Sequence, residues 1–204
     1  KSILSNSIWP LFLDRNDRIW MGYYNSGVGI YDKLYDKFKD VESLPNAKNS
    51  LQINSVASVV EDAFGNMWFA MDGGGIDIYN PQTKEIKHIN KTKGSLIKGL
   101  KSLYIESLFI DSHQNVWVGS WDSGVYFLKS GASTFVNFTK ENTHGNLASN
   151  CISSFSESAD GKIWIGTFYG GGLHSFSYET KKITRVLSKL IIDASNTVLY
   201  DLSL

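Results

Sequence analysis

Aromatic, carboxylate and amide side chains stand at matching places in four parts of the chain, a few residues after a recurring tryptophan. A flat ring can stack on the apolar face of a sugar, and carboxylate or amide groups can hydrogen-bond its hydroxyls. We therefore expect a carbohydrate-type site from these residues: Tyr23, Tyr24, Asn25, Asp72, Trp121, Asp122, Phe168 and Tyr169. Lys101 and Tyr104 lead into a later strand, and Lys101 could also pair with an acidic sugar. The alternative is that these loop aromatics pack on neighbouring units and that Asp72 only makes a turn.

Catalytic chemistry has fewer candidates. Asp72 and Asp122 form the one carboxylate pair that could serve a glycosidase or lyase, which needs two such groups facing one substrate. The four histidines share no metal-ligand spacing, and Cys151 fits a small core residue better than a nucleophile. We expect no catalytic residue, no metal and no cofactor in this segment.

The bulk composition excludes several classes of protein. The 204 residues carry 20 basic and 20 acidic side chains, and no basic stripe indicates nucleic-acid binding. No apolar run approaches the length of a membrane span, so any membrane contact would come through other parts of a parent chain. The single cysteine rules out an internal disulfide.

A repeat positions all of these residues. Trp20, Trp68, Trp117 and Trp164 are separated by 48, 49 and 47 residues. Four further columns accompany them, at six and three residues before each Trp and at two and about seven residues after it. The six-before column holds Asp14, Asp62, Asp111 and Ser158, and the seven-after column holds Gly27, Gly75, Gly124 and Gly172. A fixed period of this length indicates copies of one small structural unit.

Each copy contains four short apolar runs separated by turn residues, which predicts a four-stranded antiparallel sheet. Four such sheets predict an all-β chain of β-propeller blades, at about 5–45, 51–92, 101–140 and 149–188. Residues 196–204 repeat the start of a blade, so we expect a fragment of a larger, seven-bladed propeller. An incomplete ring would leave apolar blade faces open, which favours self-association.

The fourth copy reads Asp160-Gly161-Lys162-Ile163-Trp164-Ile165-Gly166-Thr167, followed by Gly171-Gly172-Leu173. This pattern resembles the two-component regulator propeller repeat, and the resemblance extends over all four copies. It implies the extracytoplasmic sensor of a hybrid two-component histidine kinase of the Bacteroidetes type, in which such repeats build paired propellers. It also implies a periplasmic location and a polysaccharide-derived oligosaccharide as the ligand.

Three functions follow as hypotheses. The leading one is a non-enzymatic sensor segment that binds an oligosaccharide and signals to a histidine kinase. The alternatives are a propeller glycosidase or lyase, and a protein-interaction scaffold in which the loop aromatics contact another chain.

Overall fold

The computed structural model describes residues 3–34, 37–45, 47, 49–92, 95 and 97–186. These residues form sixteen strands in four antiparallel sheets of four strands each, and they contain no helix. Within this part of the chain, therefore, no helix is long and apolar enough to cross a membrane. The expected all-β propeller fold is confirmed, and the expected strand at 196–204 lies outside the described residues.

The strands of each sheet follow one another in chain order. The first strands are β1 (Ile8–Leu13), β5 (Val56–Glu61), β9 (Ile105–Ile110) and β13 (Ile152–Glu157). The second strands, which carry the recurring tryptophans, are β2 (Arg18–Tyr23), β6 (Met67–Met71), β10 (Val116–Ser120) and β14 (Ile163–Thr167). The third strands are β3 (Val28–Asp32), β7 (Gly75–Tyr79), β11 (Val125–Leu128) and β15 (Gly172–Ser177). The fourth strands are β4 (Lys37–Val41), β8 (Ile86–Ile89), β12 (Val136–Phe138) and β16 (Lys182–Arg185).

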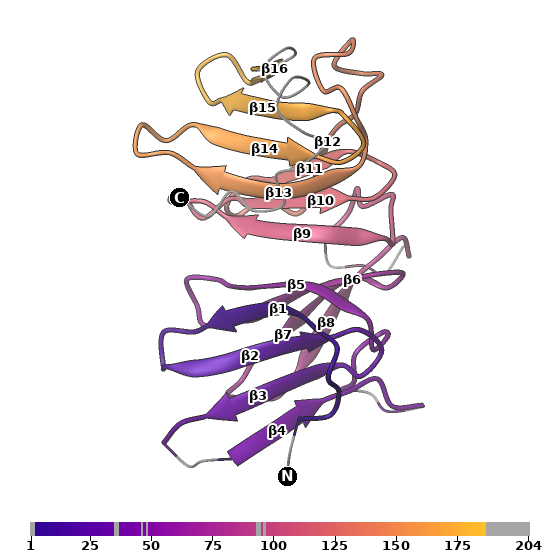
Figure 1. The fold of residues 1–204 in the computed structure, drawn as a ribbon, viewed down its shortest axis with the longest axis vertical. Helices are drawn as coiled ribbons and strands as arrows, with labels where there is room; N and C mark the ends of the chain where they lie inside the picture. Colours follow the sequence, from indigo (N-terminus) through magenta and orange to yellow (C-terminus); the bar gives the residue numbers. More distant parts are fainter. Residues whose placement is uncertain are drawn as a thin grey trace.

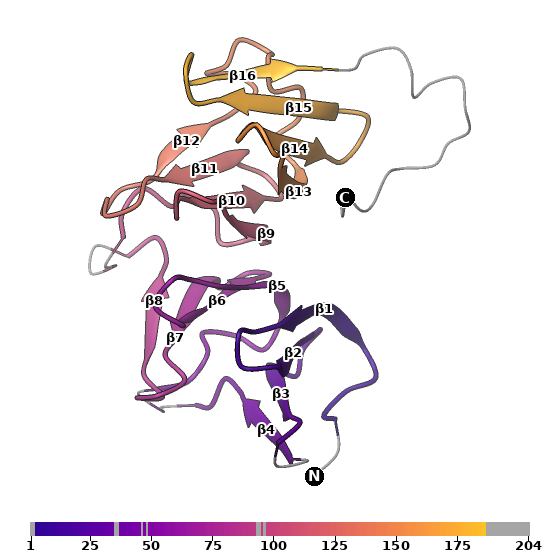
Figure 2. The ribbon, with the colours of Figure 1, turned by 90° about the vertical axis from the view of Figure 1, so that its left-hand side faces the viewer.

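The four sheets, here called blades 1 to 4, follow one another in an arc (Figure 1). Their first strands are neighbours in chain order, β1 with β5, β5 with β9, and β9 with β13. The fourth strands β4, β8, β12 and β16 lie toward the periphery in Figure 2. All sixteen strands fall within the four residue ranges expected for the blades.

The hydrophobic core lies between blades. Three clusters of buried side chains join blade 1 to 2, 2 to 3, and 3 to 4. Strands β6 and β10 are buried at every position because a neighbouring blade covers each of their faces. Trp20 and Trp117 are fully buried in two of these interfaces, so these two indoles lie wedged between neighbouring blades.

An aspartate six residues before the tryptophan holds the turn and the indole together. One carboxylate oxygen of Asp111 accepts the backbone N–H groups of His113 and Asn115 at 2.9 Å, and the other accepts the indole N–H of Trp117 at 2.7 Å. The same indole bond joins Asp14 to Trp20 at 2.8 Å and Asp62 to Trp68 at 3.0 Å. The repeated Asp column therefore orients the buried ring as well as shaping the turn.

The glycine seven residues after the tryptophan joins adjacent blades. The N–H groups of Gly27, Gly75 and Gly124 donate to carbonyls of the segment leading into the next blade, at 2.8 to 2.9 Å. These acceptors are the carbonyl oxygens of Asn54, Leu103 and Asn150. All three glycines have φ between +74° and +83°, a region that side chains disfavour.

A buried polar side chain on the third strand anchors the segment that leads into the first strand of the same blade. Asp77 accepts the backbone N–H of Gln52 at 2.8 Å, and the Tyr126 hydroxyl accepts that of Ser102 at 3.0 Å. In blade 4, His174 Nε2 accepts the backbone N–H of Ala148 at 3.0 Å. These three anchor residues occupy one position of the blade and differ in chemistry.

The outer face of blade 1 remains open in the structure. Leu11 and Leu13 on β1 are exposed, whereas Val59, which occupies the position of Leu11 in blade 2, is buried against blade 1. At the other end of the arc, Trp164 is only half-buried, and the Lys162 ammonium lies 5.7 Å from its ring centroid. The two ends therefore expose apolar surface that is covered between the inner blades.

Candidate ligand-binding face

The residues that follow the four tryptophan strands occupy equivalent places and form one face of the arc, here called the loop face. The backbone N–H groups of Tyr24, Asp72, Trp121 and Phe168 each donate to a carbonyl at the start of their own blade, at 3.0 to 3.2 Å. Isolated bridges pair Tyr24 with Ser55 and Asp72 with Tyr104, so the loops of blades 1 and 2 also meet the next blade. The loop face therefore collects candidate residues from all four blades.

Tyr23 does not belong to this surface. Its side chain is 0% exposed and lies over Gly29, where an added Cβ would be 2.3 Å from the phenol oxygen. Burial raises the pKa of the Tyr23 hydroxyl. The expectation that Tyr23 contacts a ligand is therefore wrong, because the absence of a side chain at Gly29 lets the ring fold into the core.

Three aromatic rings meet on the loop face of blades 3 and 4. The centroid of Trp121 lies 5.9 Å from that of Phe168 and 5.6 Å from that of Tyr169, with an interplanar angle of 90° to the latter. Trp121 is 44% exposed and Tyr169 is 76% exposed. Because Trp121 and Tyr169 are open to solvent and the half-buried Phe168 lies against both, the trio offers a preformed aromatic surface that bridges two blades.

A second aromatic pair lies on blade 1. Tyr24 stacks on Trp9 with centroids 4.7 Å apart and an interplanar angle of 29°, and both side chains are exposed. Asn25 follows with its own side chain exposed and a φ of +92°, and its N–H donates to the Asn54 carbonyl. Sequence reasoning missed Trp9, because it lies in an apolar run assigned wholly to the core.

A β-bulge explains the position of Trp9. In every blade the pairing of the first and second strands shifts by one residue close to the loop face. Bulges re-aim side chains, and the shifted stretches include Trp9, Ala57, Glu106 and Ser153. The pattern of apolar residues could not reveal the bulges, although Glu106 inside a strand of apolar neighbours was a usable signal.

Glu106 adds a carboxylate to the expected pair. Burial, followed by the negative charge of Asp72, raises the pKa of Glu106. Burial, followed by the charges of Glu106 and Asp122, raises the pKa of the buried Cys151 thiol to about 11. Asp72 therefore lies near enough to Glu106, and Glu106 and Asp122 near enough to Cys151, for their charges to be felt on this part of the loop face.

The remaining candidates lie around these groups. Lys101 and Tyr104 are exposed; the Lys101 backbone N–H donates to the Tyr126 hydroxyl at 3.3 Å, and the Tyr104 carbonyl accepts the N–H of Trp121. The exposed Asp122 carboxylate accepts the Ser123 hydroxyl at 2.9 Å. Across the described ranges, no three His, Cys, Asp or Glu side chains are grouped so that they could hold a metal ion.

Comparisons with known proteins agree with this architecture. The family described as Two component regulator propeller matches residues 146–169. Histidine kinase P4 of Formosa agariphila is 31% identical over 189 residues, which cover 90% of this chain and 13% of that protein. The chain thus spans a small part of this curated relative.

Solved structures share the fold at lower identity. The extracellular domain of the putative hybrid two component system BT3049 from B. thetaiotaomicron superposes with a TM-score of 0.77 at 20% identity, covering 90% of this chain and 24% of that one. Virginiamycin B lyase from Staphylococcus aureus superposes with a TM-score of 0.64 at 14% identity, covering 89% of this chain and 56% of the lyase. Taken with the four blades and their shared columns, these findings show that the chain is built of repeats similar to the two-component regulator propeller family, whose model matches residues 146–169.

Proposed function

We propose that this chain is an extracytoplasmic, non-enzymatic sensing segment of a hybrid two-component sensor, which binds an oligosaccharide released from a polysaccharide and signals to a histidine kinase. The observation that carries the proposal is the aromatic trio on the loop face, in which Trp121 and Tyr169 are exposed and Phe168 is half-buried. The similarity to a histidine kinase and the repeat family support the signalling context. In this proposal the segment is periplasmic and belongs to a seven-bladed propeller.

The chemistry of the loop face favours a neutral or amino sugar over an acidic one. The rings of the trio can stack on a pyranose, and Asp72 and Asp122 can accept hydrogen bonds from its hydroxyls. The Asp72, Asp122 and Glu106 carboxylates would repel a uronic acid or a sulfated sugar, and Lys101 is the single cation among the loop-face candidates to oppose them.

Signalling would follow from the position of the trio across two blades. Trp121 belongs to blade 3, whereas Phe168 and Tyr169 belong to blade 4. A ligand held by all three rings would favour one packing of the two blades, and it can shift that equilibrium only by its differential affinity for the two states. In the complete seven-bladed propeller the apolar face of β1 would pack on a neighbouring blade, and in the isolated segment the same face would favour self-association.

The test is calorimetric titration of the protein with a panel of neutral, amino and acidic oligosaccharides. Trp121→Ala and Tyr169→Ala should each weaken binding about tenfold, the loss expected for a ring contact of ~1.4 kcal/mol. Leu34→Ala, at an exposed position between β3 and β4, is the matched control and should bind as the parent does. The absence of binding by every sugar, or equal affinities of the Trp121 variant and the parent, would refute the proposal.

A glycosidase or lyase is the second candidate, and one observation favours it. Glu106 has a raised pKa beside Asp72, and paired carboxylates with different proton affinities can act as acid and base. Incubation of the protein with oligosaccharides and mass spectrometry of the products distinguishes the two functions. Turnover that disappears in Glu106→Gln and Asp72→Asn would establish the enzyme and overturn the sensor.

A further inference from the structure

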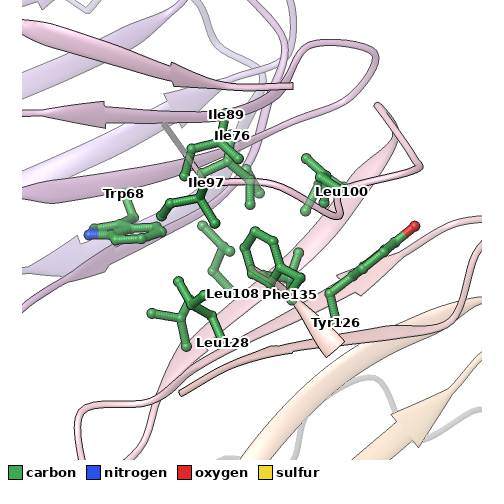
Figure 3. Close-up of a cluster of buried hydrophobic side chains, with 13 residues drawn as sticks. Trp68, Ile76, Ile89, Ile97, Leu100, Leu108, Tyr126, Leu128 and Phe135 are labelled. Atoms are coloured by element: carbon green, nitrogen blue, oxygen red, sulfur yellow. The ribbon is translucent and has the colours of Figure 1, made fainter. Parts of the chain in front are cut away.

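A hollow beside Trp68, at the turn end of the interface between blades 2 and 3, has a volume of about 260 Å³. Figure 3 shows the Trp68 indole at one end of the buried cluster, with Leu128 and Ile97 next to it. The hollow is lined by Trp68, Ile97, Ile110 and Leu128 on its apolar side, together with residues 129–132 and the turn that contains Asp62 and Phe64. It is formed by the turn that precedes the tryptophan strand, whereas the loop face is formed by the residues that follow that strand.

The hollow exists because one blade lacks an aromatic residue that the others have. The residue before each tryptophan pairs with Tyr79 in blade 2, Leu128 in blade 3 and Phe176 in blade 4. Tyr79 covers Trp20 edge-on with centroids 6.0 Å apart, and Phe176 covers Trp117 at 4.9 Å. Leu128 is smaller than either ring, and Trp68 retains 7% exposure where Trp20 and Trp117 have none.

The neighbouring interface shows which group would fill such a space. Two residues beyond Phe176, the phenol of Tyr178 lies edge-on to Trp117 with centroids 6.3 Å apart, and its ring lies 5.4 Å from His113. The Tyr178 hydroxyl donates to Asp111 Oδ2 and accepts from Asn115 Nδ2 at 3.1 Å. The polar partners of this hydroxyl therefore come from the turn that precedes β10, while Phe127 and Phe176 also lie against its ring.

Blade 2 repeats that turn without the phenol. Asp62, Phe64, Asn66 and Trp68 occupy the positions of Asp111, His113, Asn115 and Trp117. Asp62 Oδ2 accepts the Trp68 indole at 3.0 Å and Asn66 Nδ2 at 2.9 Å, as Asp111 Oδ2 does with its own partners. Phe64 is 87% exposed at the place where His113 covers the phenol, and Ser130 replaces the tyrosine.

We propose that this hollow binds a small molecule carrying a hydroxylated aromatic ring. The ring packs against Trp68 and Leu128 and beneath Phe64, and its hydroxyl donates to Asp62 Oδ2 and accepts from Asn66. The volume is sufficient, because a buried apolar cavity of about 150 Å³ binds benzene. An adjoining hollow of about 280 Å³ shares Asp62 and Trp68 and adds polar side chains such as Glu85 and Lys87, which leaves room for a polar substituent.

The probe for this proposal is p-cresol, titrated into the protein and followed by calorimetry and by the indole N–H resonances in NMR spectra. Binding should move the Trp68 resonance, which is assigned with Trp68→Phe. Toluene lacks the hydroxyl and should bind at least fivefold more weakly. The loop-face variant Trp121→Ala should bind p-cresol as the parent does, which separates this site from the proposed sugar site.

The decisive variant is Leu128→Phe with Ser130→Tyr, which places the blade 4 residues in blade 3. It should abolish p-cresol binding and raise the unfolding temperature, because it fills the hollow from within. If the double variant fails to fold, Leu128→Phe alone should weaken p-cresol binding at least tenfold. An absence of p-cresol binding to the parent, equal binding by toluene, or undiminished binding by the filled variants would each overturn the proposal.

Discussion

Substitution of Gly124 by alanine tests whether the repeated glycine column is needed for blade packing. Gly124 has a φ of +74°, and an added Cβ would lie 2.2 Å from the carbonyl oxygen of Phe138. Its N–H donates to the Asn150 carbonyl of blade 4 at 2.8 Å. Gly131 supplies a matched control, because its φ is +77° and nothing lies within 4 Å of the added Cβ.

The magnitudes of the two losses follow from this geometry. The left-handed conformation costs an alanine roughly 1–2 kcal/mol, and reduced freedom of the unfolded chain offsets about 0.5 kcal/mol of it. Gly131→Ala should therefore lower the free energy of unfolding by about 1 kcal/mol. At Gly124 the overlap with a backbone oxygen adds about 1–3 kcal/mol, and a displaced bond between blades adds about 1 kcal/mol. We expect Gly124→Ala to lower the free energy of unfolding by about 3–5 kcal/mol.

Urea unfolding of the two variants and the parent, followed by tryptophan fluorescence at pH 7, measures the difference directly. Gly27→Ala and Gly75→Ala should behave like Gly124→Ala, since their added Cβ atoms would lie 2.4 and 2.5 Å from carbonyl oxygens. Equal losses for Gly124→Ala and Gly131→Ala would show that the column reflects only backbone conformation, and the packing argument would then fail.

Two further stability predictions concern buried polar groups. Burial, followed by the charge of Arg185, lowers the pKa of His174 from 6.5 to about 4. Between these pH values the imidazole is protonated in the unfolded chain and neutral in the folded chain. Stability that is present above pH 6.5 is therefore lost as the pH falls toward 4, by about 3 kcal/mol. Urea unfolding across this range should show that loss reduced in His174→Gln and unchanged in His144→Gln; identical curves for parent and His174→Gln would contradict it. Asp111→Asn should lower the free energy of unfolding by about 1–3 kcal/mol, because asparagine has one acceptor oxygen, so either the buried Trp117 indole or the turn N–H groups lose their acceptor; an unfolding midpoint equal to that of the parent would contradict this.

The repeat made most of the fold predictable from the sequence. Equally spaced tryptophans, each preceded by an Asp turn and followed by a glycine, define the blade, because these residues have backbone and hydrogen-bonding roles that depend little on neighbours. The structure adds the reasons: Asp111 accepts an indole as well as turn N–H groups, and Gly124 donates to the next blade. Neither bond is visible in a single copy of the motif.

The candidate site was only partly predictable. Sequence reasoning placed Trp121, Phe168 and Tyr169 in equivalent loops, but the contact between their rings is seen only in the structure. It treated Tyr23 and Tyr24 alike. In the structure the Tyr23 ring packs in the core over Gly29, where no side chain competes for the space, whereas Tyr24 is exposed. It omitted Trp9 and Glu106 because a bulge shifts side chains by one position without changing the pattern of apolar residues.

The third-strand anchor gives blades 2 and 4 different responses to acidity. The group that accepts the backbone N–H of the segment leading into the first strand is the Asp77 carboxylate in blade 2, the Tyr126 phenol in blade 3 and the His174 imidazole in blade 4. In blade 2 a hydrogen bond from His88 to Asp77 raises the pKa of that histidine, so protonation strengthens the anchor there, whereas protonation of His174 breaks the anchor of blade 4. Acidification toward pH 4 would thus loosen one end of the arc, after protonation of His88 at higher pH has tightened its middle, and exchanging these residues between copies would move the weak point along the chain without redesigning a blade.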